Sequence, residues 1–167
     1  MNSKICMVAA ACLFGLVSQT FAQVPQQIGK FKEWGTYKYT SKGAITCYIL
    51  SVPTAQLPAT VDHGDNYFMI RRMHSQPVEY EPQVEAGYQL KPDSKVTLSV
   101  DGQSFSLFTE GNRAWLEDSA NGKQLMAILR AGQSMTISAE SQRGTKTQYE
   151  YSLMGISAAL NATSPCR

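Results

Sequence analysis

The chain has 167 residues, of which 43% are hydrophobic, and this length is enough for one domain with a buried core. Its 15 basic and 13 acidic residues give a formal net charge of +2 at pH 7. A balance so close to neutral argues against a protein that binds nucleic acid through electrostatic attraction.

The first predicted element is a three-part leader over residues 1–22. A lysine precedes an apolar run over residues 5–17, and a short polar stretch then ends at Ala22. This pattern is typical of a secretory signal peptide that is cut between Ala22 and Gln23. The apolar run is too short for a membrane-spanning helix, which needs about 20 such residues. A lipidated Cys12 is the alternative, but the large aliphatic residue expected three places earlier is missing.

Removal of the leader would leave residues 23–167, which we interpret as a single domain with a flexible stretch up to residue 30. This part has no second apolar stretch that could cross a membrane, and it keeps only two cysteines, Cys47 and Cys166. Because two cysteines in an exported chain usually pair, we predict an intramolecular disulfide between them. We place the protein in the periplasm, at the outer membrane or outside the cell. The alternative is a free, buried Cys47, with Cys166 in a frayed tail or an intermolecular bridge.

Short stretches of alternating apolar and polar residues dominate the chain after Trp34. The clearest of them leads into Asp101-Gly102, the preferred pair for a two-residue turn, and predicts a hairpin over residues 96–109. Helical spacing predicts one helix between a cap at Asp118 or Ser119 and Gly132, and a second over residues 155–162. Many short strands with turn residues between them indicate an all-β fold, an immunoglobulin-like β-sandwich of short antiparallel strands with one or two short helices. The other predicted strands are at residues 35–40, 45–50, 67–73, 84–90, 112–116, 135–139 and 147–153.

No pattern of residues points to a catalytic, metal or cofactor site. His63 lies in the segment Asp62-His63-Gly64-Asp65, whose composition is typical of a turn, and two histidines cannot form a three-histidine zinc site. The serines and glycines match no nucleophile or phosphate-binding motif. Glu79 and Glu81 would share one strand face, but the prolines beside them favour a solvated edge over acid–base chemistry. We therefore predict a protein that is not an enzyme and that binds no cofactor or metal.

Two groups of residues are candidates for a contact surface. Arg71 and Arg72 form a basic spot, and Tyr37 and Tyr39 lie in the first half of the chain, which is rich in aromatic residues. Surface arginines are ordinarily solvated, and aromatic residues of a sandwich mostly fill its core. The alternatives are attachment to an anionic cell surface and contact with a protein or glycan through exposed tyrosines.

Several segments resemble the invasion-associated locus B family of exported alphaproteobacterial proteins. The resemblance covers residues 31 to 166 and implies a β-sandwich domain in the periplasm or at the outer membrane. Founding members are named for a role in the invasion of host cells, notably erythrocytes, and members similar to them carry more cysteines than this chain. No catalytic residue can be carried over from the family. The segments that carry the resemblance are Phe31–Tyr37, Cys47-Tyr48, Val61–Asp65, Arg143-Gly144-Thr145 and Tyr151–Leu160.

Together these observations predict an exported, non-enzymatic β-sandwich protein that contacts an unidentified protein or cell-surface partner. A link to host-cell invasion is what the resemblance implies. The alternative is a periplasmic small-ligand-binding protein or enzyme with a pocket near the junction of sandwich and helices. A cavity at which His63, His74 or the pair Glu79 and Glu81 converge would favour this alternative.

Overall fold

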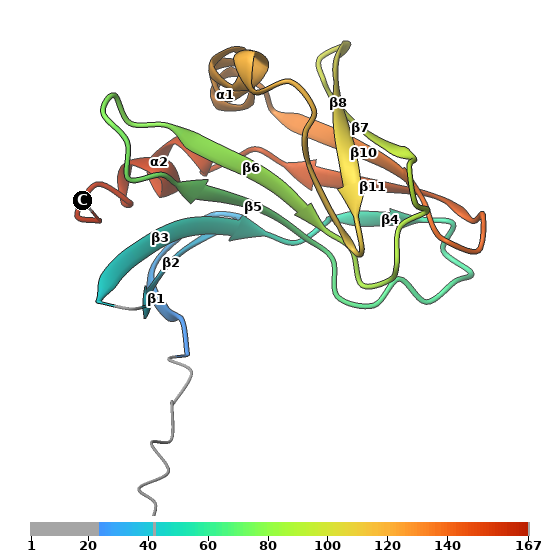
Figure 1. The fold of residues 1–167 in the computed structure, drawn as a ribbon, viewed down its shortest axis with the longest axis horizontal. Coiled ribbons are helices and arrows are strands. Elements are labelled where there is room, and N and C mark those ends of the chain that lie inside the picture. Colours follow the sequence, from blue (N-terminus) through green and yellow to red (C-terminus); the bar gives the residue numbers. More distant parts are fainter. Residues whose placement is uncertain (1–23, 42, 167) are drawn as a thin grey trace, which may run out of the picture.

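The computed structural model describes residues 24–41 and 43–166. The predicted signal peptide and its cleavage site between Ala22 and Gln23 therefore lie outside the described residues. Within the described residues the chain forms eleven strands, one 3-10 helix and two short α-helices (Figure 1). Their bounds are β1 Gln26–Phe31, β2 Trp34–Ser41, β3 Ala44–Ser51, β4 Ala55–Leu57, β5 Tyr67–Arg72, β6 Tyr80–Glu85, β7 Lys95–Val100, β8 Gln103–Glu110, β9 Arg113–Leu116, η1 Ser119–Asn121, α1 Gly122–Ala131, β10 Ser134–Glu140, β11 Lys146–Ser152 and α2 Ile156–Asn161.

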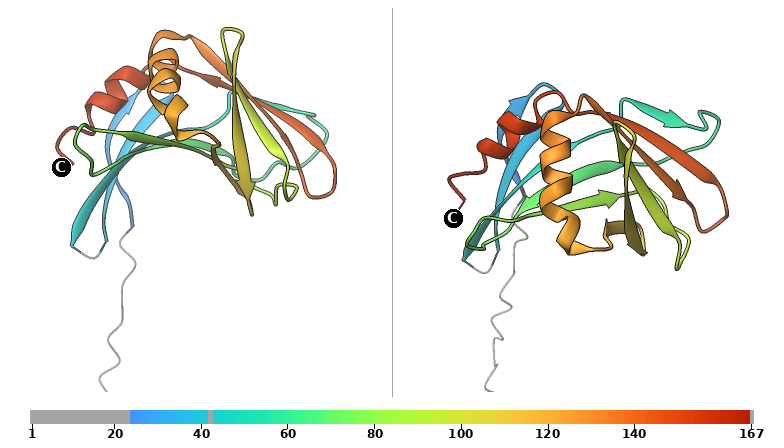
Figure 2. Two further views of the ribbon diagram at one scale, coloured as in Figure 1. Left: turned by 45° about the horizontal axis from the view of Figure 1, so that its top comes forward. Right: turned by 90° about the horizontal axis from the view of Figure 1, so that it is seen from above.

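The strands form one antiparallel sheet that curls over a shared core. Its order is β1-β2-β3-β5-β6-β9-β8-β7-β10-β11-β4. Helix α1 packs against β6 and helix α2 against β1, β2 and β3, and the two helices contact each other (Figure 2). Contacts cross the core, because Phe68 of β5 packs against Tyr151 of β11 with their ring centroids 6.2 Å apart. The predicted all-β, sandwich-like fold with two short helices is confirmed.

The core follows from the alternation that the sequence shows. In β7 the side chains of Val96, Leu98 and Val100 are buried, while those between them are more exposed. Helix α1 buries Leu125, Met126 and Leu129 on one face. Burial of such side chains contributes about 1.5–3 kcal/mol each, so these stripes fix which face of each element turns inward.

Helix α1 ends where its sequence predicts, but it begins later than predicted, at Gly122, because a short 3-10 helix comes first. The carboxylate of Asp118 accepts a hydrogen bond from the backbone N–H of Ala120 at 2.9 Å, so Asp118 is the cap of the short 3-10 helix that leads into α1. The backbone N–H of Gly132 donates to the Ile128 carbonyl and closes the last turn. Neither predicted cap, Asp118 or Ser119, is the cap of α1 itself, which is Asn121 and makes no side-chain capping hydrogen bond.

Three strand predictions differ from the structure. Residues 26–31 form β1 rather than a flexible stretch, and they pair with β2 through backbone groups. The short β4, at which no strand is predicted, pairs with β11. Its three residues are too few to show an alternation of apolar and polar side chains. The strand predicted at residues 84–90 is instead β6, which includes Pro82. Proline is tolerated there because no strand pairs with this part of β6 on one side within the described residues.

The hairpin of β7 and β8 has the predicted turn, with φ of 48° at Asp101 and 81° at Gly102. We expect Gly102→Val to lower the free energy of unfolding by about 1 kcal/mol or more, because a β-branched residue resists positive φ. A Cβ atom at this position would meet no other atom within 4 Å, so the cost comes from the backbone alone. Urea denaturation measures it, with Gly102→Asn as a control that tolerates positive φ. An unchanged midpoint for Gly102→Val would contradict the argument.

Candidate functional site

Four neighbouring strands bring aromatic and charged side chains into one row on the outer face of the sheet. Tyr37 of β2 is opposite Tyr48 of β3, Tyr48 is opposite Arg71 of β5, and Arg71 is opposite Glu81 of β6. Directly opposite residues of antiparallel strands project to the same face, so these side chains are neighbours. Tyr39 joins the row because its ring meets that of Tyr48 edge to face at 6.1 Å. We call Tyr37, Tyr39, Tyr48 and Arg71 the tyrosine row.

The rings of the tyrosine row pack on one another rather than in the core. Tyr37 and Tyr48 stack with their ring centroids 5.3 Å apart and an angle of 15° between their planes. Burial, followed by the neighbouring phenols of Tyr37 and Tyr39, raises the pKa of Tyr48 above its ordinary value. The ring hydroxyl of Tyr48 therefore stays neutral at physiological pH. The row offers half-buried rings with polar tips, a combination that suits protein and glycan contact.

Arg71 is held at one end of the row by Glu81. Its Nη2 atom lies 2.7 Å from a carboxylate oxygen of Glu81, and 42% of the arginine side chain is exposed. Exposed ion pairs contribute only about 0–1 kcal/mol to stability, so this pair mainly orients the guanidinium. The buried Nε atom of Arg71 has no hydrogen-bond partner among the described residues.

The structure joins three of the four predicted contact residues. Tyr37, Tyr39 and Arg71 lie together, whereas Arg72 is one residue further along β5 and points to the other face, beside Tyr80. Sequence reasoning missed Tyr48 as a member of the row. The signal for it was present, because Cys47 and Ile49 alternate with Tyr48 and are buried on the opposite face.

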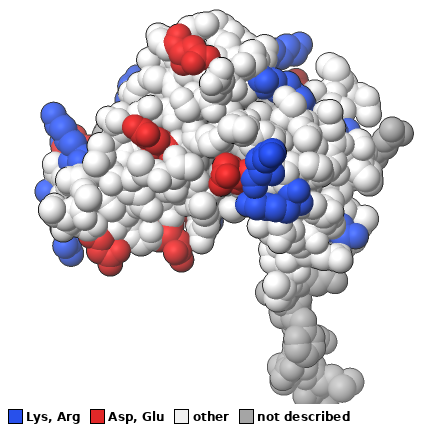
Figure 3. Space-filling view, turned by 180° about the vertical axis from the view of Figure 1, so that it is seen from behind, with Lys and Arg blue, Asp and Glu red and all other residues white. Residues whose placement is uncertain are grey.

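Charges on the surface are mixed and do not form one large basic patch on the face that Figure 3 shows. On that face, lysine and arginine side chains lie in separate groups with acidic side chains between them. This distribution agrees with the small net charge of the sequence.

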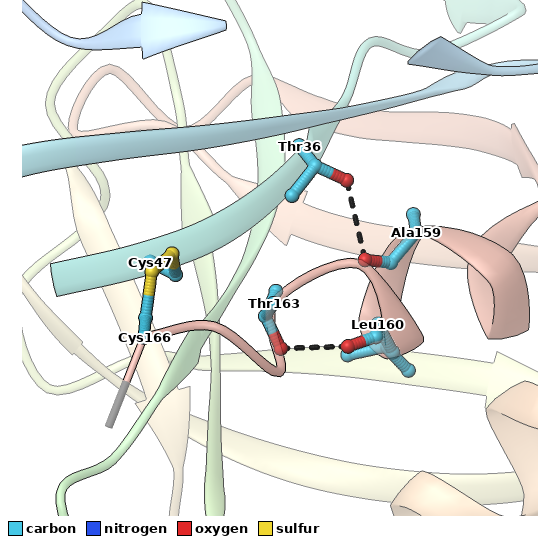
Figure 4. The surroundings of a disulfide bond; sticks show 6 residues. All are labelled: Thr36, Cys47, Ala159, Leu160, Thr163 and Cys166. Carbon is cyan, nitrogen blue, oxygen red and sulfur yellow. Dashed lines mark hydrogen bonds between the residues drawn. A yellow bond between two sulfur atoms is a disulfide. The ribbon is translucent and has the colours of Figure 1, made fainter. Parts of the chain in front are cut away.

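A disulfide fastens the C-terminal segment to the sheet (Figure 4). It joins Cys47 of β3 to Cys166, with the two Cα atoms 5.8 Å apart and both residues buried. Around it, the Thr36 hydroxyl donates to the Ala159 carbonyl at 3.2 Å, and the Thr163 hydroxyl donates to the Leu160 carbonyl at 2.6 Å. The predicted intramolecular disulfide is confirmed, and it holds α2 against β2 and β3.

His63 belongs to a buried network of hydrogen bonds. Its Nε2 atom lies 3.0 Å from the Pro58 carbonyl oxygen, which can only accept, so this nitrogen carries a proton. Its Nδ1 atom lies 2.9 Å from the Tyr149 hydroxyl, which is itself 3.0 Å from the Tyr88 hydroxyl. The network continues from Tyr88 to the Thr147 hydroxyl at 2.6 Å, and this hydroxyl also lies 3.4 Å from the Ala139 carbonyl oxygen, to which it donates. Burial raises the pKa of Tyr149 above its ordinary value, with the Tyr88 hydrogen bond as the next cause.

This network is structural. The segment around His63 forms the predicted turn, because Asp62 accepts the backbone N–H of Gly64 at 2.9 Å and Gly64 has a φ of 59°. Its function is to fasten that turn to β11 through satisfied polar groups. Among the described residues no three histidine, cysteine or acidic side chains are grouped as a metal site would require.

A cavity of about 1020 Å³ lies between the start of β6, the end of β9 and helix α1. We call it the trough. Glu79 and Glu81 line it, whereas His63 and His74 do not. Its position corresponds to the junction of sandwich and helices at which the sequence placed the alternative pocket. Its lining combines aromatic residues such as Trp115 with charged residues of both signs, which suits binding of a ligand that has apolar and polar parts.

Fold and site together define a small all-β, sandwich-like protein whose C-terminal segment is joined to β3 by a disulfide. The profile of the Invasion associated locus B (IalB) protein family matches residues 37–164, so the chain belongs to this family.

The fold is similar to that of the crystal structure of invasion associated protein b from Bartonella henselae. It is 14% identical in sequence, with a TM-score of 0.60, and the match covers 86% of this chain and 96% of that one. No curated protein sequence matches this chain. In the part of the chain that the structure describes, no helix is both long and apolar enough to cross a membrane.

Proposed function

We propose that this chain is an exported, non-enzymatic protein that acts by binding a protein or cell-surface partner through the tyrosine row. In this proposal the leader is cut between Ala22 and Gln23, and residues 23–167 act as one domain in the periplasm, at the outer membrane or outside the cell. Family membership and the disulfide support export, since disulfides persist in oxidising compartments. A role linked to host-cell invasion follows from the family name and belongs to the proposal.

The observation that carries the proposal is the placement of three tyrosines outside the core. A sandwich normally buries its aromatic residues, as Trp34 and Phe68 are buried here. Tyr37 and Tyr48 instead stack on the outer face beside an arginine, and Tyr39 meets Tyr48 there edge to face. Tyrosine and arginine are enriched in the energetic centres of protein interfaces, because both supply large contact areas with polar groups at their ends.

We expect the double variant Tyr37→Ser/Tyr39→Ser to bind erythrocyte ghosts at least tenfold more weakly than the unmodified protein. Two large contact residues would be lost, and the loss of one residue at the energetic centre of an interface weakens the free energy of binding by about 2 kcal/mol or more. Flow cytometry with the labelled protein measures the affinity.

The matched control for this experiment is Gln124→Ser. It changes an exposed residue of helix α1, which contributes no residue to the tyrosine row. Thermal unfolding shows that each variant is folded. If the folded tyrosine variant binds as well as the control, the tyrosine row is not the contact surface. If the unmodified protein itself does not bind, erythrocytes are not its partner.

Ligand binding in the trough is a second candidate function, favoured by the presence of both Glu79 and Glu81 in its lining. Neither histidine lines the trough, so its residues offer binding rather than histidine acid–base chemistry.

A further inference from the structure

The trough lies beside the first part of strand β6, which pairs with a neighbouring strand on one side only within the described residues. Strand β6 pairs with β5 from Tyr80 to Glu85, but it pairs with β9 only from Gln83 to Glu85. The reason is that β9 ends at Leu116, after which the chain leaves the sheet toward α1. Residues Tyr80–Pro82 therefore have no strand on that side within the described residues.

The backbone groups at this edge point into the trough. The N–H of Met73 donates to the carbonyl of Glu79 at 2.9 Å, so residue 79 directs its backbone groups to the β5 side. The N–H of Ala86 donates to the carbonyl of Asn112 at 2.8 Å, so residue 86 directs its groups to the β9 side. Successive residues of an antiparallel strand alternate between the two sides. Residues 80 and 82 therefore share the side of residue 86, and they present the N–H of Tyr80 and the carbonyls of Tyr80 and Pro82.

Helix α1 forms the facing wall of the trough. Lys123, Met126, Ala127 and Arg130 are spaced as i, i+3, i+4 and i+7, so they share one helix face, and all four line the trough. The guanidinium of Arg130 lies 5.9 Å from the ring centre of Tyr80, at the boundary between the two walls.

Two stacked aromatic rings form an apolar part of the lining. Phe108 and Trp115 lie with their ring centroids 5.7 Å apart, and Phe108 is 45% exposed. A large hydrophobic side chain with this exposure, beside open backbone hydrogen-bonding groups, is a feature that sheets ordinarily cover.

We propose that the trough binds an extended peptide, which adds as a strand to the open edge of β6. Its backbone would bond to Tyr80 and Pro82, in the space that β9 leaves after Leu116. A side chain on one face of the peptide would rest on Phe108 and Trp115. Open N–H and carbonyl groups at strand spacing select a polypeptide backbone over other amphipathic ligands, and strand addition of this kind is a general mode of peptide recognition. This inference is independent of the tyrosine row, because it uses different residues and a different kind of partner.

The test uses a blocked synthetic peptide of alternating valine and threonine with a central phenylalanine, a lysine at one end and a glutamate at the other. Binding is followed by tryptophan emission. The chain has two tryptophans, and Trp34 is fully buried, so Trp115 reports on the trough. We expect a saturable change in emission on addition of the peptide.

Two modified peptides separate strand addition from simple apolar contact. Each carries N-methyl groups on one of the two alternating sets of backbone amides, with identical side chains. A peptide added to β6 directs one set toward the strand and the other toward solvent. We expect one modified peptide to bind at least tenfold more weakly and the other to bind like the parent. Equal affinities for both would overturn the proposal.

A pair of variants on one helix places the site. Ala127→Phe fills the trough from an exposed helix position, and Gln124→Phe adds the same side chain at an exposed position outside the trough. We expect at least a tenfold loss of affinity for Ala127→Phe and none for Gln124→Phe. Undiminished binding of the peptide by Ala127→Phe would reject the site. Saturable binding of monomeric dodecyl maltoside, an amphipathic ligand without a peptide backbone, together with no binding of the parent peptide, would also reject the proposal. The two modified peptides decide the proposal on the unmodified protein even if Ala127→Phe does not fold.

Discussion

Replacing Cys47 and Cys166 together by alanine is expected to lower the free energy of unfolding by about 4–5 kcal/mol at most. The disulfide joins residues 119 positions apart, and closing so long a loop removes much of the conformational freedom of the unfolded chain. Residual structure in the unfolded chain reduces the effect below this upper figure. A loss of this size is comparable to the whole stability of a marginal domain.

Urea denaturation of the oxidised protein, the reduced protein and the double alanine variant measures this effect. Reduction alone should reproduce most of the loss, because it opens the same loop without changing the buried surface. Mass spectrometry of non-reduced protein from the periplasm, after alkylation, should find no free thiol and a chain that begins at Gln23. Two alkylated cysteines, or a dimer that separates on reduction, would contradict an intramolecular bond.

The disulfide and the central hairpin could be predicted because each depends on few residues. Only two cysteines follow the predicted leader, which leaves one intramolecular pairing between them, and the Asp101-Gly102 pair favours one type of two-residue turn. Helix α1 could be predicted for a similar reason, since its apolar stripe and final glycine lie within one short segment, although its first residue was not predicted correctly. Local chemistry is sufficient for elements of this kind.

The edge strands could not be predicted, because backbone pairing rather than side-chain burial holds them in place. Four of the six residues of β1 are exposed, and β4 has only three residues. Nor did the sequence indicate that His63 is buried, because its partner Tyr149 is 86 residues away. Such contacts are set by how distant strands meet.

The two candidate sites depend on register, which the sequence leaves open. The tyrosine row exists because four strands align Tyr37, Tyr48, Arg71 and Glu81 across the sheet. A shift of one residue in any strand would send its member of the row to the other face. The trough depends on a difference in length between β6 and β9, and this difference appears only when the two strands are paired.

Strand β2 carries the core and the tyrosine row on its two faces, and substitutions should separate these roles. Trp34 is fully buried, its Nε1 donates to the Ser152 carbonyl at 3.0 Å, and its ring meets Phe68 edge to face at 6.2 Å. Trp34→Ala would leave a cavity and an unpaired carbonyl between the two halves of the sheet. We expect it to lower the free energy of unfolding by about 3–5 kcal/mol.

Tyr37, three residues along the same strand, is the matched comparison, because it is also a large aromatic residue but packs on the outer face. Tyr37→Ser should lower the free energy of unfolding by about 1 kcal/mol, the scale of one cross-strand aromatic pair. Urea denaturation followed by circular dichroism measures both variants. Equal losses for the two would show that the outer rings support the fold as much as the core does, and the tyrosine row would then be a structural feature. A much larger loss for Trp34→Ala leaves the outer tyrosines available for contact, because the fold does not depend on them.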